Sequence, residues 1–208
     1  MNKTHKLVTY SLLIALVCVG TMFIKIHVPA TNGYVNIGDA FIIISSLMFG
    51  PVAGMIAGGI GSAMADLLSG YAHFAVFTLI VKGIEGYIIG WLFVKFGGTK
   101  LAGMYSSLAG VAFMVLGYFM VETVMYSSYK VALQSIAFNG VQALASFIIG
   151  YPVFSYISKN VRLKPLIISK SFVTWDILSV YIFSFVPLLS IKFLEMSTPI
   201  FISESDSG

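Results

Sequence analysis

The sequence predicts an all-α membrane protein, a bundle of six transmembrane helices, and three observations lead to this fold class. Hydrophobic residues make up 58% of the 208 positions and charged residues only 10%, and the mean hydropathy is +0.96. A soluble domain carries about a quarter charged residues, so a soluble fold could not bury this much apolar surface. A transmembrane helix needs about 20 residues, which leaves room for six or seven helices with short loops.

Polar breaks rich in glycine and proline divide the apolar sequence into helices. The first apolar run is long for a signal peptide and no small-residue cleavage pattern follows it, so we interpret it as a retained helix. Asp39 is expected to cap the second helix, and Gly50 and Pro51 to separate it from the third. These two helices are short, so a tilted or partly re-entrant hairpin is an alternative to two full crossings. The expected helices are 7–25, 39–49, 52–68, 74–96, 101–126 and 132–157.

The chain is expected to consist of a six-helix membrane domain, 1–165, and a C-terminal tail, 166–208. The tail contains an apolar segment, 172–194, that is long enough to cross a bilayer but includes Asp176 and Pro187. A seventh transmembrane helix and a helix lying along the membrane surface are both compatible with this composition.

Basic residues indicate how the helices are oriented. In a six-helix arrangement most of them fall on one side of the membrane, which predicts a multi-pass protein of the cell membrane with a cytoplasmic N-terminus. Because they sit at helix ends, they do not form the basic patch typical of nucleic-acid binding. The side expected to be cytoplasmic carries Lys3, Lys6, Lys95, Lys100, Lys159, Arg162, Lys164 and Lys170, and the opposite side carries Lys25 and Lys130.

Several classes of enzyme and cofactor site lack the residues they need. A single cysteine, Cys18, excludes an intramolecular disulfide and a CxxC-type metal site. The three histidines lie outside the predicted helices, and Asp39 and Asp66 are expected at helix ends, Asp66 in contact with loop water, so neither a membrane serine protease nor an aspartyl protease is indicated. No phosphate-binding GxxxxGK[ST] loop occurs, so any ATP hydrolysis must come from a partner. We predict no enzyme, no metal and no cofactor in this chain.

Polar residues within the predicted helices mark a candidate binding site, because such groups are costly in hydrocarbon. Thr78, Lys82 and Glu85 share one helix face, as do Asn139 and Gln142. Lys82 and Glu85 lie about 12 Å and about 16 Å below the outer end of their helix. A polar cluster that opens outward favours a receptor for an external solute over a pore, which needs polar lining throughout. Mutual neutralisation of Lys82 and Glu85 is the structural alternative, and the two interpretations are compatible.

Three segments together resemble a known family. They are YVNIGDA at 34–40, FGPVAGMIAGGIGSAMADLLSGY at 49–71 and FTLIVKGIEGYIIG at 77–90. They are similar to the substrate-binding S components of energy-coupling factor (ECF) vitamin transporters, in particular the group with hydroxymethylpyrimidine and riboflavin-type members. The resemblance covers about 5–165. It implies a six-helix protein that captures a vitamin from outside and works with a transmembrane coupling (T) protein and two ATPases that use ATP.

The resemblance also implies a binding site and a docking surface. The family forms its pocket from the first loop and the outer halves of helices four to six. With the polar helix faces, this predicts substrate-binding roles for Asn36, Thr78, Lys82, Glu85, Glu122, Tyr126, Asn139 and Gln142. The family's Ala-x-x-x-Ala surface for the coupling protein corresponds to Ser11, Ala15 and Val19, where Val19 departs from the pattern.

Residue chemistry and resemblance together indicate a small polar heteroaromatic vitamin or precursor as the ligand. One lysine lies among acidic and amide groups, beside Tyr34 and Tyr126, and such a site can hydrogen-bond and stack on a ring. Hydroxymethylpyrimidine is the leading choice by resemblance. Pyridoxine, riboflavin and cobalamin are alternatives, and a stand-alone channel, a secondary transporter and an intramembrane enzyme are the competing functional classes.

Overall fold

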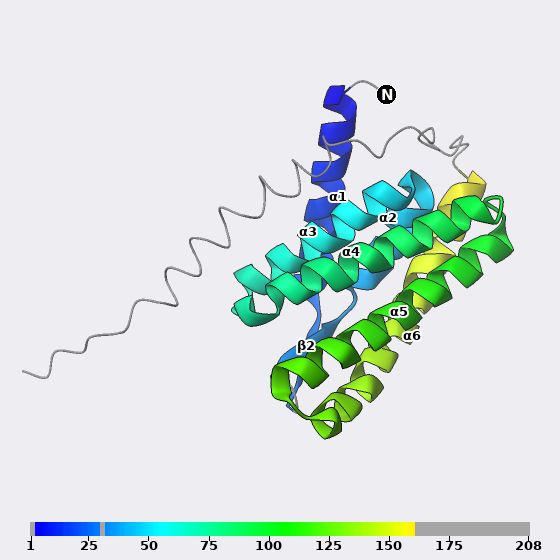
Figure 1. Cartoon of the computed structure of the whole chain (residues 1–208). Helices are drawn as coiled ribbons and strands as arrows, with labels where there is room; N and C mark the ends of the chain where they lie inside the picture. The colour runs from blue at the N-terminus through cyan, green and yellow to red at the C-terminus, as the bar shows by residue number, and fades with distance from the viewer. Residues whose placement is uncertain (1–2, 30–31, 161–208) are drawn as a thin grey trace, which may run out of the picture. The chain divides into compact units, whose positions relative to one another are not determined.

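The computed structural model describes residues 3–29 and 32–160, which form six helices and one β-hairpin (Figure 1). The predicted all-α membrane fold is confirmed, and five of the helices are long and apolar enough to cross a membrane. The predicted tail, 166–208, with its apolar segment 172–194, lies outside the described residues. In order, the elements are α1 (Lys3–Phe23), β1 (Lys25–Val28), β2 (Gly33–Asn36), α2 (Gly38–Phe49), α3 (Pro51–Leu68), α4 (Ala72–Lys95), α5 (Lys100–Tyr126) and α6 (Tyr129–Asn160).

The helix ends follow from local residue chemistry. Gly50, with φ of 90°, separates α2 from α3, and Pro51 occupies the first turn of α3, where its missing N–H is not needed. The Thr99 hydroxyl caps α5 by accepting a hydrogen bond from the Ala102 N–H at 3.1 Å. These signals can be read from the sequence, so the expected and observed helix boundaries agree within a few residues.

Helix α2 is the exception in length. Its 12 residues rise about 18 Å, whereas a hydrocarbon core is about 30 Å thick. Both α2 and α3 have one end at Gly50, and α3 has 18 residues, so the first turn of α2 stops about 9 Å short of the other end of α3. Asp39, in this first turn, therefore lies inside the bundle.

The segment leading into α2 forms the antiparallel hairpin β1–β2, in which Lys25 pairs with Asn36 and Val28 with Gly33. The sequence indicated a turn-rich loop here, and the strands were not predicted. The hairpin occupies the space that the short α2 helix leaves at its N-terminal end (Figure 1). We call this end of the bundle, where the α3–α4 and α5–α6 connections also lie, the hairpin end.

Small residues bring α3 and α4 close together. A Cβ at Gly54 would lie 2.7 Å from the Gly86 carbonyl oxygen, and a Cβ at Gly58 would lie 2.6 Å from the Lys82 carbonyl oxygen. Only glycine allows this backbone approach, as is common between membrane helices. The four-residue spacing of Gly54 and Gly58 is typical of close helix packing within a bundle, and the structure shows this packing between α3 and α4.

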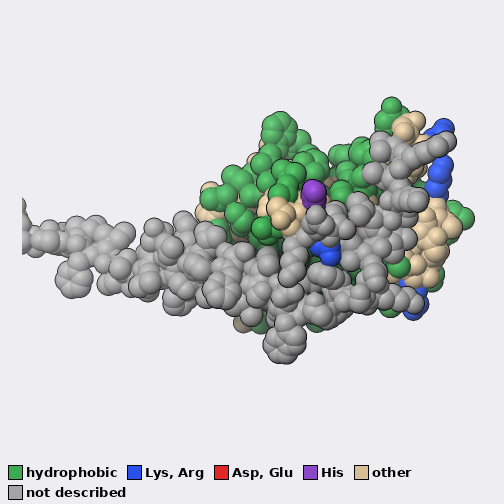
Figure 2. All heavy atoms as spheres, turned by 90° about the horizontal axis from the view of Figure 1, so that it is seen from above, with side chains coloured by type: hydrophobic (Ala, Val, Ile, Leu, Met, Phe, Trp, Pro, Cys, Tyr) green, Lys and Arg blue, Asp and Glu red, His purple; other side chains and the backbone are tan. Residues whose placement is uncertain are grey.

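Large apolar side chains cover the outside of the bundle. Leu12 on α1, Leu116 on α5 and Ile148 on α6 are each at least 60% exposed. Figure 2 shows hydrophobic side chains over much of the described surface in that view, with lysines at its right-hand edge and one near the middle, close to a histidine. Apolar surface of this extent on long helices fits contact with lipid, in agreement with a multi-pass membrane protein.

Candidate functional site

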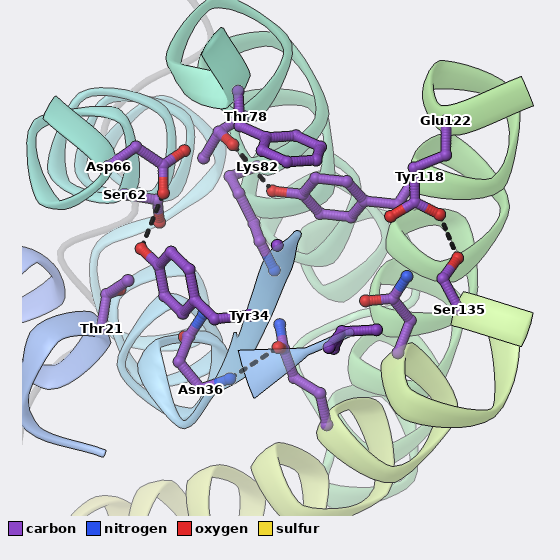
Figure 3. Close-up of a pocket in the computed structure, with 15 residues that line it drawn as sticks. Thr21, Tyr34, Asn36, Ser62, Asp66, Thr78, Lys82, Tyr118, Glu122 and Ser135 are labelled. Atoms are coloured by element: carbon purple, nitrogen blue, oxygen red, sulfur yellow. Dashed lines mark hydrogen bonds between the residues drawn. The ribbon is translucent and has the colours of Figure 1, made fainter. Parts of the chain in front are cut away.

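A pocket lies beneath the hairpin, where five helices and both strands contribute side chains (Figure 3). Its cavity volume is about 40 Å³, which corresponds to about three water molecules. A larger ligand would therefore require lining side chains or the hairpin to move. The lining residues are Thr21, Val28, Gly33, Tyr34, Asn36, Ser62, Asp66, Phe74, Thr78, Lys82, Tyr118, Glu122, Ser135, Asn139 and Gln142.

The pocket brings together most of the residues predicted from the sequence. Glu85 and Tyr126 are not among its lining residues: Glu85 is fully buried behind the pocket, and Tyr126 ends α5. Their roles in substrate binding, like those of the other six, stay predictions. The six that line the pocket are Asn36, Thr78, Lys82, Glu122, Asn139 and Gln142.

A buried charge network forms the floor of the pocket. The Lys82 ammonium donates a short hydrogen bond to Asp39 Oδ1 and lies 3.5 Å from Glu85 Oε2. The Gln142 side chain donates from Nε2 to Asp39 Oδ2 at 2.7 Å and accepts from the Asn36 N–H at 2.7 Å. The network thus links α4, α2, α6 and β2.

Asp39 was predicted to cap α2, and this prediction is wrong. Ile37 occupies the capping position without a side-chain hydrogen bond, and Asp39 is fully buried against Lys82. The cause is the short α2 helix, which starts inside the bundle at the depth of Lys82. Lys82 and Glu85 are neighbours as expected, but the hydrogen-bonded partner of Lys82 is Asp39.

Asp66 was expected in contact with loop water, whereas the structure buries it to 4% exposure. Its Oδ1 accepts a hydrogen bond from the Tyr34 hydroxyl at 2.7 Å. Burial and the Asp66 carboxylate raise the pKa of the Tyr34 phenol above its usual value, so the hydroxyl remains a donor. A second bond, from the Lys25 ammonium to the Ser69 hydroxyl at 2.6 Å, also holds the hairpin to the α3–α4 end.

The opposite wall of the pocket comes from α5 and α6. The Tyr118 hydroxyl donates to the Thr78 hydroxyl at 3.0 Å, and the Ser135 hydroxyl donates a short hydrogen bond to Glu122 Oε2. Tyr118 was not predicted, although it lies four residues before Glu122 and so shares its helix face. Sequence reasoning also did not place Thr21, Ser62 and Ser135 in the site, because single hydroxyl residues in a helix carry no distinct signal.

The pocket is rich in hydrogen-bond acceptors. Asp66 and Glu122 line it as carboxylates, whereas Lys82, its one basic lining residue among the residues described, is balanced by Asp39 and Glu85. This arrangement favours a ligand with hydrogen-bond donors or positive charge over an anion. Over residues 3–29 and 32–160, no group of three histidine, cysteine, aspartate or glutamate side chains is arranged to hold a metal ion.

Comparison with known proteins identifies the family. A family model described as the ECF-type riboflavin transporter, S component, matches residues 1–159. An uncharacterized protein from Pyrococcus woesei, described as lying in a gap 3′ region, is 42% identical over 153 residues, which are 73% of this chain and 99% of that protein. The thiamine precursor transporter HmpT of Lactococcus lactis is 28% identical over 123 residues, 59% of this chain and 69% of HmpT.

These matches agree with the sequence resemblance and with the bundle of apolar helices. The family model covers 159 of the 208 residues, which includes every helix that the structure describes except for the last residue of α6. The chain therefore belongs to the ECF-type riboflavin transporter S component family, whose members are membrane-embedded substrate-binding subunits for vitamin uptake and not enzymes.

Proposed function

We propose that this chain is the substrate-binding subunit of an ATP-driven ECF importer and that its substrate is hydroxymethylpyrimidine. The observation that carries the proposal is the acceptor-rich pocket beneath the hairpin, in which Asp66 and Glu122 face the cavity and Lys82 is already paired. The name of the relative HmpT, a thiamine precursor transporter, points to the same class of ligand.

The chemistry of an aminopyrimidine complements this lining. Its amino group can donate a hydrogen bond to the carboxylate of Asp66 or Glu122. A carboxylate also stabilises the positive charge of a protonated ring. Asn139 offers both a donor and an acceptor to ring nitrogens. The ring of Tyr118 lines the pocket and provides an aromatic surface for stacking.

Pocket size supports a single-ring ligand over a larger vitamin. A cavity of about 40 Å³ is closer in volume to a pyrimidine than to the three-ring flavin of riboflavin or to cobalamin. The side chains and the hairpin would therefore have to move less to admit a pyrimidine. Pyridoxine is also a single ring, but each of its hydroxyl groups offers one O–H donor, whereas the pyrimidine amino group offers two N–H donors.

Binding of labelled vitamins to the purified protein tests the substrate assignment. We expect hydroxymethylpyrimidine to bind at least about 100-fold more tightly than riboflavin or pyridoxine, because its amino group presents two N–H donors to the acidic lining from a single position on one ring. Competition with unlabelled ligands gives the order of affinity directly. Tighter binding of riboflavin, pyridoxine or cobalamin than of hydroxymethylpyrimidine would contradict the assignment.

We also propose that the hairpin end faces outward and that the N-terminus is cytoplasmic. Lys6, Lys95, Lys100 and Lys159 lie at the end of the bundle away from the hairpin, where the positive-inside rule places cytoplasmic residues. In this orientation the pocket opens toward the outside, as capture of an external solute requires.

Delivery is proposed to depend on a coupling protein, which docks on α1, and on two ATPases. Ser11, Ala15 and Val19 are all exposed on this helix, so a partner in the membrane can reach them. The Ala15→Trp variant is expected to retain vitamin binding but to lose at least about 90% of uptake in vesicles that also contain the coupling protein and the two ATPases. The large ring would prevent close packing between α1 and a helix of the coupling protein.

The matched control is Leu116→Trp, an equally bulky change at a lipid-facing position of α5 that is 60% exposed. It is expected to leave uptake close to that of the wild type. Full uptake by Ala15→Trp would contradict docking on this face. Robust uptake by the wild-type chain without the ATPases would contradict the importer mechanism and favour a stand-alone transporter.

A further inference from the structure

Two hydroxyl groups in the pocket wall have no hydrogen-bond partner. Thr21, on α1, and Ser62, on α3, are each only 2% exposed, and neither Thr21 Oγ1 nor Ser62 Oγ bonds to another group of the protein. Both residues line the pocket. A buried hydroxyl without a partner destabilises a protein, and most buried polar atoms are paired. We call Thr21 and Ser62 the α1–α3 corner.

The surrounding residues keep this corner polar and open to the pocket. Ser62 lies one helical turn from Asp66, whose Oδ1 is held by Tyr34. Gly38 makes room for the Thr21 hydroxyl, because a Cβ at Gly38 would overlap Thr21 Oγ1 and would lie 2.8 Å from Asn36 Oδ1. Figure 3 shows Thr21, Ser62 and Asp66 on the side of the pocket opposite Glu122.

We propose that the α1–α3 corner binds a hydroxyl group of the ligand and selects for it. Serine and threonine hydroxyls each donate one hydrogen bond and accept others, so a ligand hydroxyl can donate to one and accept from the other. A methyl group in the same place would leave both side chains unpaired. The nearby Asp66 carboxylate disfavours a ligand carboxylate or phosphate at this position.

The inference rests on the proposed function and deepens it by assigning two neighbouring groups of the ligand. If Asp66 accepts from the amino group, the hydroxymethyl group on the adjacent ring carbon reaches the α1–α3 corner, because Ser62 lies one helical turn from Asp66. Neither Thr21 nor Ser62 belongs to the first loop or to helices four to six, from which the resemblance predicted the pocket. They therefore add a specificity-determining contact from the other side of the bundle.

The test compares hydroxymethylpyrimidine with the same ring carrying a methyl group in place of the hydroxymethyl group. Affinities are measured by calorimetry for the wild type and for Thr21→Val, Ser62→Ala and the double variant. In the wild type, loss of the ligand hydroxyl is expected to weaken binding about 10- to 100-fold. In the double variant, the two ligands are expected to bind within about threefold of each other.

A matched control is Ser45→Ala, because Ser45 is also buried and unpaired but lies on α2 outside the pocket lining. It should keep the wild-type preference for the hydroxyl. The unfolding temperature of the ligand-free double variant should equal or exceed that of the wild type, since neither substitution removes a hydrogen bond within the protein.

Two results would overturn the inference, and they are distinguishable. If both pyrimidines bind but the double variant retains the wild-type preference, the α1–α3 corner does not contact the ligand hydroxyl, and a bound water accounts for the polar wall. If the wild type binds neither pyrimidine, the proposed function itself fails and the assignment of the corner fails with it.

Discussion

The Lys82→Met variant is expected to lose about 3–5 kcal/mol of stability, because the change leaves buried carboxylates without their positive partner. Lys82 is 2% exposed and pairs with Asp39 and Glu85, both fully buried. Methionine has a similar volume, so the loss would come from charge and not from a cavity. Thermal unfolding of the purified protein in detergent measures this loss of stability. The elution profile of the same sample on a sizing column shows whether the variant is still folded before heating.

Two further variants isolate the charge. Lys95→Met removes a lysine from the exposed end of the same helix and is expected to change stability by less than about 0.5 kcal/mol. Combining Lys82→Met with Asp39→Asn and Glu85→Gln removes all three charges and should recover most of the lost stability. An unchanged melting temperature for Lys82→Met alone would show that Lys82 does not hold the network together.

Removing both carboxylates from the pocket lining is expected to abolish most ligand affinity. In the double variant Asp66→Asn with Glu122→Gln, the amides keep the shapes of the side chains, and the amide oxygen introduced at position 66 can still accept from the Tyr34 hydroxyl. Each charge-assisted hydrogen bond contributes about 1.5–3 kcal/mol, so hydroxymethylpyrimidine should bind at least about 100-fold more weakly. Calorimetric titration of the purified variant measures the change.

A ligand analogue provides the control for this prediction. A pyrimidine with a carbonyl oxygen in place of the amino group presents an acceptor where the proposed ligand presents a donor. The wild type should prefer the amino form strongly, and the double variant should lose most of that preference. If the double variant binds hydroxymethylpyrimidine as tightly as the wild type does, neither carboxylate recognises the ligand.

The sequence predicted the elements of this structure well because their signals are local. Apolar runs predicted the helices, and Gly50 and Pro51 predicted the boundary between α2 and α3. The spacing of Gly54 and Gly58 indicated close packing against a neighbouring helix, which the structure identifies as α4. Helix faces also identified Lys82, Asn139 and Gln142 as residues that would meet in one pocket.

The sequence did not predict which of the polar groups pair. Asp39 looked like a helix cap because it follows a turn-rich loop, and Asp66 looked like a helix-end residue. Both are buried because the hairpin fills the space above α2 and because Tyr34 reaches from the hairpin to α3. Asp39 and Lys82 are 43 residues apart in the chain, so no local pattern relates them.

The sequence by itself thus determined the membrane class, the helices, their tight packing and the family resemblance. The tertiary structure decided the depth of Asp39, the partner of Lys82 and the contribution of Thr21 and Ser62 to the pocket wall. The physical reason is one of range. Hydropathy and helix capping depend on neighbours within a few residues, whereas the pairing of buried polar groups depends on the relative depth and rotation of helices that are distant in the chain.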